Sequence, residues 1–436
     1  MRRYLVFILI ALFAVVPALS LGSCNASKQA DTLKAGSYTG IGEKVTLRFI
    51  SSWGGVDSKA DTLQNVLNGF MKENPQYEVV NESLFGDDFL PKLKTDFASG
   101  NDPDVFGLWP GSDIRALIKA GRVADLTEVL AEDKKWKESF GSSMWQYTTF
   151  NDRIYGLPVE IIFECLFVNR DLFERYNIKI PGTFDELKQA IAAFRERDII
   201  PVAYNSLAQG TYIYQNIIAA LGGKDDVEHP LSGGKINSCY IDAMELMKEL
   251  YRMGAFPKDA FTLTSVQRNE LFKTKKAAMI VQGSWFIGEF RNDDMSVDIV
   301  PFPKIKEGKS RLSAMIYGLG CGTFYMSKNA WDNKEKRVGS LKLLKTLTSR
   351  DSAFQFAEMT GMLSNVDTNG NVVHYNRLTK KGQEMLESSA ELIGPPDSFV
   401  DRSVWEGIIV KKFPYVLEGK IDPKAVWDEA IAASVN

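Results

Sequence analysis

Apolar residues beyond residue 44 recur in two alternating patterns along the chain. Residues 45–49 alternate apolar and polar side chains, which predicts a strand with one buried face. Residues 63–71 carry apolar side chains at helical spacing, and Asn74-Pro75 ends that helix because proline cannot continue it. Further strands are predicted at 77–80 and 104–109, with a helix between them that stops at Gly100. This alternation of strand and helix predicts an α/β fold with a largely parallel sheet.

The same alternation continues after residue 151. Thr183 and Glu186 have the spacing of a capping box, in which the two side chains satisfy free backbone N–H groups at a helix start. A helix over 212–221 is expected to close at Gly222-Gly223. Additional strands are predicted at 154–159, 164–168, 199–204, 277–281, 297–301 and 319–326, and the chain is mainly helical from about residue 334.

The first 24 residues differ in character from the rest. Arg2 and Arg3 precede an uncharged apolar run over 4–21, which is typical of a secretory signal and also long enough to be weighed as a membrane span. The run closes with Leu21-Gly22-Ser23-Cys24, which resembles the lipobox of bacterial lipoproteins and implies a lipid-modified Cys24. An uncleaved anchor helix and an ordinary signal with an incidental cysteine remain alternatives. Residues 24–43 are rich in Ser, Lys, Thr and Gly and are expected to form a flexible tether.

Composition narrows the class of protein. About 410 residues after the leader exceed the usual ~100–200 residues of one domain, so two domains are expected. A net charge of −3 offers no electrostatic reason to bind nucleic acid. Beyond Cys24 an odd number of cysteines excludes a complete disulfide framework, so we expect buried free thiols. These are Cys165, Cys239 and Cys321.

The sequence offers little material for catalysis. His229 and His374 are the only histidines, too few for a histidine-rich zinc site or a typical Ser-His-Asp arrangement. The glycines of 318–322 are not followed by the Gly-Lys-Ser/Thr of a phosphate-binding loop, and they favour a close backbone approach instead. The stretch that begins at Asp367 starts like a calcium loop, but it lacks the glycine and the final glutamate of one and is expected to be a turn. We therefore expect no catalytic residue, no metal site and no cofactor.

Six short blocks occur in order along the chain. They are Phe70–Pro75; Lys92-Leu93 with Ala98–Val105; Ala120–Thr127; Tyr155–Pro158 with Val168–Phe173; Pro181–Leu187; and Phe272–Met279 with Gly283-Ser284-Trp285. Together they resemble the family 1 extracellular solute-binding proteins of bacterial ATP-driven sugar importers, to which the maltose-binding protein is related. Phe184 stands where the family usually has Trp, and Lys275 stands where it usually has Gly. The resemblance extends over nearly all of the chain beyond Lys44.

The resemblance implies a two-lobed periplasmic-binding-protein fold, in which each lobe is a mostly parallel sheet with helices on both faces. Lobe-crossing segments would form a hinge. The expected division is 1–23 signal peptide, 24–43 tether, 44–158 and 306–361 lobe 1, and 159–305 and 362–436 lobe 2. The implied function is capture of a sugar or oligosaccharide between the lobes and delivery to transmembrane permease subunits, by a monomer anchored through Cys24 on the extracytoplasmic side of the cell membrane.

A sugar presents apolar C–H faces and hydroxyl groups, so its site needs aromatic platforms together with carboxylates and amides. The resemblance implies that Trp285 stacks on the ligand. Other candidates match the family by position along the chain, and any of these aromatic residues could instead belong to the core. The further candidates are Trp53, Glu160, Tyr212, Trp405 and Trp109, with Asp113 and Asp401 as weaker polar ones.

Other functions remain open at this point. The same fold can hold a polyamine, a metal chelate or another small ion, although anion sites rely on Arg and helix N-termini rather than on aromatic residues. A secreted glycosidase would need two carboxylates about 5–9.5 Å apart across a sugar. A surface adhesin or sensor without a transporter is a third possibility.

Overall fold

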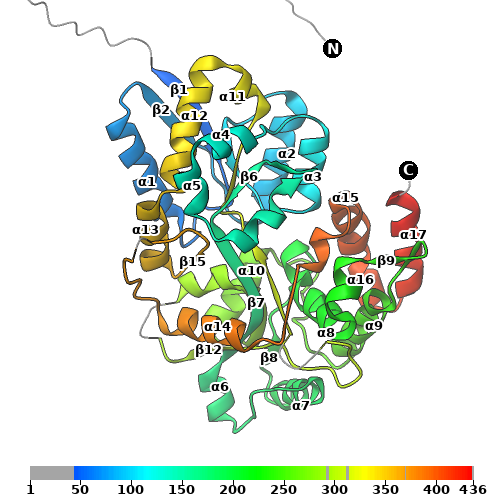
Figure 1. The fold of residues 1–436 in the computed structure, drawn as a ribbon. Coiled ribbons are helices and arrows are strands. Elements are labelled where there is room, and N and C mark those ends of the chain that lie inside the picture. The colour runs from blue at the N-terminus through cyan, green and yellow to red at the C-terminus, as the bar shows by residue number, and fades with distance from the viewer. Residues whose placement is uncertain (1–43, 291–293, 311–313, 369, 435–436) are drawn as a thin grey trace, which may run out of the picture. The chain divides into compact units, whose positions relative to one another are not determined.

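The computed structural model describes residues 44–290, 294–310, 314–368 and 370–434. Figure 1 shows this part of the chain as helices and strands, coloured from blue to red along the sequence. The expected signal peptide, Cys24 and the tether lie outside the described residues. Within the described residues, no helix combines the length and the apolar character that crossing a bilayer requires.

One group of strands forms a five-stranded sheet in the order β2-β1-β3-β14-β6. The strand β1 runs parallel to β2 and β3, whereas β14 runs antiparallel to β3 and β6. The strands are β1 (Val45–Ile50), β2 (Tyr77–Asn81), β3 (Val105–Gly107), β6 (Gly156–Pro158) and β14 (Thr323–Met326). The short pair β4 (Thr149–Phe150) and β5 (Arg153–Ile154) precedes β6.

Helices cover both faces of this sheet because its strands carry apolar side chains on both sides. Phe324 and its alternate neighbour Tyr325 lie in different apolar clusters, one against α1 and α12 and the other against α2 and α3. The helix α1 ends before Asn74-Pro75 and α2 ends at Gly100 with φ 77°, both as predicted. We call this sheet and its helices lobe 1. The helical segments are α1 (Ala60–Glu73), η1 (Gly86–Asp88), α2 (Phe89–Ser99), α3 (Ser112–Lys119), α4 (Thr127–Glu132), α5 (Lys134–Glu138), η2 (Ser142–Tyr147), α11 (Lys328–Asp332), α12 (Lys334–Leu347) and α13 (Arg350–Thr360).

A second sheet is built around the long strand β7 (Glu160–Asn169). Its strands run in the order β16-β13-β7-β11-β8, and β12 and β15 also pair with β7. Its other strands are β8 (Ile200–Val202), β11 (Ala277–Gly283), β12 (Val297–Val300), β13 (Ala314–Leu319), β15 (Leu363–Ser364) and β16 (Glu391–Ile393), and β9 (Leu231–Ser232) pairs separately with β10 (Lys235–Ile236).

The second sheet also has an apolar cluster on each face. Leu166 of β7 packs among α7, α8 and α9, whereas its neighbour Phe167 packs towards α10 and α14. The predicted capping box of Thr183 and Glu186 starts α7. We call this sheet and its helices lobe 2. Its helical segments are α6 (Arg170–Arg175), α7 (Phe184–Arg195), η3 (Ala208–Thr211), α8 (Tyr212–Glu228), α9 (Ser238–Arg252), α10 (Ser265–Lys273), η4 (Ser284–Glu289), α14 (Arg377–Ser388), η5 (Pro396–Ser398), α15 (Arg402–Val404), η6 (Trp405–Val410), α16 (Lys411–Leu417) and α17 (Pro423–Ser434).

The chain passes between the lobes at three places within the described residues. It crosses from β6 to β7 at Val159, from β13 to β14 through Gly320–Gly322, and again between α13 and β15. The expected division has the chain return to lobe 1 at residue 306. The strand β13, which follows that point, still pairs with β7 of lobe 2. The α/β architecture is confirmed, and each sheet is mostly parallel in direction, because one strand in each, β14 in lobe 1 and β7 in lobe 2, runs against the others. Both sheets are still mixed, because β7 runs antiparallel to β11, β12 and β13, and β14 also runs against its neighbours.

Candidate functional site

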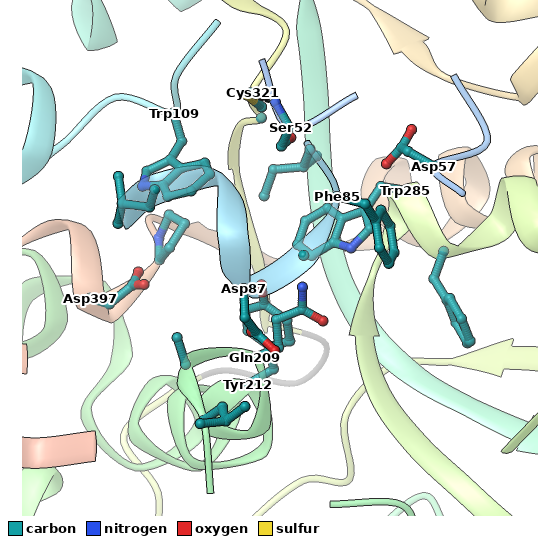
Figure 2. A pocket seen from close by; sticks show the side chains of 18 of the residues that line it. Ser52, Asp57, Phe85, Asp87, Trp109, Gln209, Tyr212, Trp285, Cys321 and Asp397 are labelled. Carbon is teal, nitrogen blue, oxygen red and sulfur yellow. Dashed lines mark hydrogen bonds between the residues drawn. The ribbon is translucent and has the colours of Figure 1, made fainter. Parts of the chain in front are cut away.

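A cavity of about 420 Å³ lies between the two lobes. Lobe 1 contributes Trp53, Asp87 and Trp109 to its wall, and lobe 2 contributes the start of β7 together with Tyr212 and Trp285. Figure 2 shows Trp109 and Trp285 on different sides of the cavity, with Asp87 and Gln209 between them in this view. Its wall therefore depends on residues from distant parts of the sequence.

The strand β7 lines part of this cavity through alternate residues. Glu160, Ile162 and Glu164 face the cavity, because successive side chains of a strand point to opposite sides of the sheet. Phe163 and Cys165 point the other way, into the apolar cluster with α10 and α14. One strand therefore supplies both core residues and two buried carboxylates of the cavity wall.

The first of these carboxylates, that of Glu160, has a cationic partner. Lys59 Nζ lies 3.6 Å from Glu160 Oε1 and 3.5 Å from Asp57 Oδ1, and Lys59 is 2% exposed. Although burial alone lowers the pKa of Lys59, the two carboxylates raise it, so the ammonium stays charged. Burial raises the pKa of Glu160, and Lys59 and the N–H of Gly322 oppose that rise.

The glycine-rich crossing over Gly320–Gly322 makes room for this pair. A Cβ atom at Gly320 would lie 2.2 Å from Glu160 Oε2, and one at Gly322 would lie 2.5 Å from the Trp53 ring. The N–H of Gly322 donates to Glu160 Oε2 at 3.0 Å. The predicted close backbone approach at these glycines is confirmed, and it serves to bring a lobe-crossing segment against the cavity wall.

The second carboxylate, that of Glu164, has no cationic partner among the described residues. Its Oε2 accepts a hydrogen bond from Asn216 Nδ2 at 2.7 Å, and the side chain is 2% exposed. Burial and then the nearby Asp397 raise the pKa of Glu164 well above its usual value, and only the Asn216 hydrogen bond opposes them. Of these two carboxylates on one face of β7, Glu160 therefore lies beside a cation, whereas Glu164 has a second carboxylate nearby.

Two aromatic rings of lobe 2 meet at one side of the cavity. The rings of Tyr212 and Trp285 lie 5.5 Å apart in an edge-to-face arrangement, and both are partly exposed. The indole of Trp285 lies over Gly283, where an added Cβ would come within 2.1 Å of the ring. Ser284 does not cap η4; its hydroxyl accepts from the N–H of Phe163 at 3.3 Å.

Charged side chains join the lobes at two edges of the cavity. On one edge, Arg402 of lobe 2 donates to Asp113 of lobe 1 at 2.8 Å and to Asp397 at 3.1 Å. Although burial alone lowers the pKa of Arg402, Asp397 and Asp113 raise it. On the other edge, Asp87 of lobe 1 accepts from both the N–H and the hydroxyl of Ser265 at the start of α10.

Comparison with known proteins identifies the family. The profile of the bacterial extracellular solute-binding proteins matches residues 57–353 of this chain, more than half of it. The chain belongs to this family. Its relatives include the multiple sugar-binding protein of Streptococcus mutans, which is 22% identical over 357 residues and covers 78% of each chain.

Solved structures share the fold of this solute-binding protein. One comes from a study of xylan utilization by Caldanaerobius polysaccharolyticus, with a TM-score of 0.79, 23% identity and coverage of 90% of this chain and 100% of that one. Another is the maltose/maltodextrin-binding domain MalE from Bdellovibrio bacteriovorus bound to maltotriose, with a TM-score of 0.72, 20% identity and coverage of 90% and 99%. The two-lobed fold implied by the sequence blocks is thus confirmed, and the family is one of solute-binding proteins rather than enzymes.

The cavity of this solute-binding protein includes some of the residues suggested by the sequence and leaves out others. Trp285, Tyr212, Trp109, Glu160 and Trp53 line it, although Trp53 is only 2% exposed and packs against Phe324 and Phe356.

Three suggested residues do not line the cavity. Trp405 is fully buried against Tyr214 and Trp427 in the core of lobe 2, so it is not part of the site that we propose. Asp401 accepts from the N–H of Ser403 at the start of α15. Asp113 reaches the site through Arg402 and through Trp109, whose Nε1 donates to Asp113 Oδ2 at 3.1 Å.

Several residues of the cavity wall were not suggested by the sequence. Glu164 had a readable signal, since it is a second carboxylate at strand spacing from Glu160 within an apolar run. Lys59, Asp397 and Arg402 carry no such signal, because their positions depend on contacts between segments that are distant in sequence. The described residues contain no group of His, Cys, Asp or Glu placed to hold a metal ion.

Proposed function

We propose that this protein captures a carbohydrate in the cavity between its lobes and delivers it to the permease of an ATP-driven importer. The observation that carries this proposal is the composition of the cavity wall. Trp109 from lobe 1 and Trp285 and Tyr212 from lobe 2 supply aromatic faces, and buried carboxylates and amides stand among them. Aromatic rings stack on the C–H faces of a sugar, while the polar groups accept and donate hydrogen bonds to its hydroxyls.

The size of the site and the known relatives support a sugar as the solute. A cavity of about 420 Å³ falls within the ~300–1,000 Å³ that small-molecule sites occupy. Curated relatives that match this chain are named for the sugars they bind, such as melibiose, raffinose and stachyose. A sugar without negative charge also suits a site in which the cations Lys59 and Arg402 are already paired with carboxylates.

Membrane attachment and transport complete the proposal. Cleavage before Cys24 and acylation of that cysteine would hold the protein at the extracytoplasmic face of the cell membrane, where an importer takes up solutes. Support comes from the Leu21-Gly22-Ser23-Cys24 sequence and from a family of extracellular solute-binding proteins. The 19 residues that follow Cys24, up to Glu43, would then form the tether.

A thermal-shift panel tests the choice of solute. The panel contains mono- and oligosaccharides, amino acids and polyamines. A ligand that binds only the folded state stabilises it by about 2.7 kcal/mol at ~100 times its Kd, so at least one sugar should raise the unfolding temperature clearly. A panel in which only amino acids or polyamines raise that temperature would refute the carbohydrate assignment.

A further inference from the structure

The two buried carboxylates of β7 differ in the partners that the protein gives them. Glu160 and Glu164 lie on the same face of the same strand, four residues apart, and both line the cavity. The charge of Glu160 is offset by Lys59 at 3.6 Å. Glu164 has only the neutral amide of Asn216, which donates to Oε2, and no described residue donates to its Oε1. Glu160 therefore has a counter-charge within the protein, and Glu164 has none among the described residues.

The surroundings of Glu164 add further negative charge. Asp397 lines the same cavity and acts on Glu164 as a like charge. Arg402 is already shared between Asp113 and Asp397, with Glu406 at 3.9 Å. The guanidinium of Arg402 thus pairs with three other carboxylates and forms no ion pair with Glu164. Arg268, which lies over the Tyr212 ring, donates to Gln209 and Asn269. A buried charge requires a partner, and at this end of the cavity the protein does not supply one.

We propose that this end of the cavity receives an ammonium group of the ligand, so that the solute is an amino sugar whose amine pairs with Glu164. The inference rests on the proposed function and names its substrate class. The aromatic pair of Tyr212 and Trp285 borders the same wall, and Glu164 pairs in register with Gly283, two residues before Trp285. A ring stacked on Trp285 would therefore lie close enough for a substituent to reach the carboxylate.

An amine and a hydroxyl at this position differ in the strength of their bond to a carboxylate. Either group forms a charge-assisted hydrogen bond with a carboxylate, but only the ammonium also supplies a counter-charge. Asp397 stabilises the ammonium and disfavours a second negative group. The site should therefore prefer an amino sugar to its hydroxyl counterpart by about tenfold in Kd, which corresponds to about 1.4 kcal/mol.

Matched pairs of sugars test this preference by isothermal titration at about pH 6, where an aliphatic amine is protonated. The pairs are glucosamine with glucose, galactosamine with galactose, mannosamine with mannose, and the glucosamine dimer with cellobiose; the N-acetylated forms control for size. We expect at least one amino sugar to bind about tenfold more tightly than both its hydroxyl and its N-acetyl counterparts. Hydroxyl sugars that bind as tightly as their amino counterparts would overturn this inference and leave the proposed function standing. If no sugar of either kind binds, both are overturned.

A second experiment assigns the preference to one carboxylate. Glu164→Gln keeps the size of the side chain and an acceptor for Asn216, and it should reduce the amino preference, measured as the ratio of the two Kd values in the same variant, to about threefold or less. The control is Asp298→Asn, which removes a carboxylate of the same sheet that pairs with Arg377 and Lys381 outside the cavity. This control should keep the full preference. An unchanged preference in Glu164→Gln, with a folded protein by circular dichroism, would overturn the assignment.

Discussion

The side chains of Asp113 and Arg402 join the two lobes through a hydrogen bond of 2.8 Å between Nε and Oδ2. Asp113 lies at the start of α3 in lobe 1, and Arg402 begins α15 in lobe 2. Both side chains are nearly buried, and the contact lies away from the three segments where the chain itself crosses. It therefore stabilises one arrangement of the lobes without holding them together covalently.

Asp113→Asn should weaken ligand binding by loosening this contact. Asp113 lies outside the wall of the cavity but accepts from Arg402 of lobe 2 and from Trp109 of the wall, so its effect on affinity acts through the arrangement of the lobes and through the position of the Trp109 ring. Loss of a charged hydrogen bond of about 1 kcal/mol would raise Kd about fivefold if the contact forms only when the lobes close. The check is isothermal titration with the sugar that the thermal-shift panel selects.

The control for this substitution is Asp401→Asn. Asp401 caps α15 by accepting from the N–H and the hydroxyl of Ser403, both within lobe 2. Its loss should cost about 1 kcal/mol of stability at most and leave Kd unchanged. Equal affinities of Asp113→Asn and the wild-type protein would contradict a role for the Asp113–Arg402 contact in closure.

Ligand binding should draw the lobes together. Each lobe has its own apolar clusters on both faces of its sheet, and three short segments connect the two, so the lobes can move as rigid bodies. Small-angle scattering should give a smaller radius of gyration at saturating ligand than without ligand. Identical scattering curves would contradict closure, although not binding.

The two carboxylates of β7 should affect stability in opposite directions. Glu160→Gln leaves Lys59 with Asp57 as its only carboxylate partner and should destabilise the protein by about 3 kcal/mol. Glu164→Gln removes a buried carboxylate without a cation and should stabilise the ligand-free protein by on the order of 1–2 kcal/mol at neutral pH. Thermal unfolding of the two variants measures both effects.

The advantage of Glu164→Gln should depend on pH with a definite sign. Because the pKa of Glu164 is raised in the folded protein, the folded state holds its proton more tightly than the unfolded state does. The wild-type protein therefore loses stability as pH rises above the usual glutamate value of 4.5, and the glutamine variant does not. The gap between their unfolding temperatures should widen from about pH 4 to about pH 7. A constant gap would contradict a raised pKa at this residue.

Local patterns in the sequence were sufficient for many elements of the fold. Residues 45–49, the end of α1 before Asn74-Pro75, the cap at Gly100 and the capping box of Thr183 are all confirmed. Each depends on backbone preferences within a few residues. The two exceptions to the predicted common strand direction, β7 and β14, were not predictable in this way, because they acquire their antiparallel partners only when the chain crosses between the lobes.

The residues of the candidate site were likewise predictable only in part. Trp285 and Glu160 line the cavity and were suggested by sequence blocks and by their place along the chain. Trp405 was suggested in the same manner, yet it is buried with Trp427 because the C-terminal helices pack onto lobe 2. Lys59 precedes α1 like any surface lysine, and only the fold brings it to Glu160. Burial of a particular side chain depends on tertiary packing that a local pattern does not contain.

Cys24 supplies a prediction about membrane attachment. Cleavage before Cys24 and acylation should hold the protein at the membrane, since a single acyl chain binds only marginally and two or three chains hold firmly. Cys24→Ser should release the protein or leave an unprocessed precursor, as seen by fractionation and gel mobility. A mature-sized protein that stays with the membrane in this variant would refute lipid anchoring through Cys24.

The indole of Trp285 is the residue on which the proposed sugar site depends most. It is partly exposed in the cavity, and Gly283 leaves the space in which the ring lies. Trp285→Ala should remove the stacking surface and weaken binding by about 2–4 kcal/mol, or roughly 30- to 1000-fold in Kd. Trp405→Phe is a matched control, because it changes a buried tryptophan outside the cavity and should leave Kd unchanged.

The most direct measurement is isothermal titration of the wild-type protein and of Trp285→Ala with the sugar that gives the largest thermal shift. Our account predicts saturable binding to the wild-type protein, a loss of at least about 30-fold in the variant, and unchanged circular dichroism. Binding of the variant within about threefold of wild type, far less than an aromatic stacking residue should lose, would contradict the claim that the sugar is captured in this cavity against Trp285.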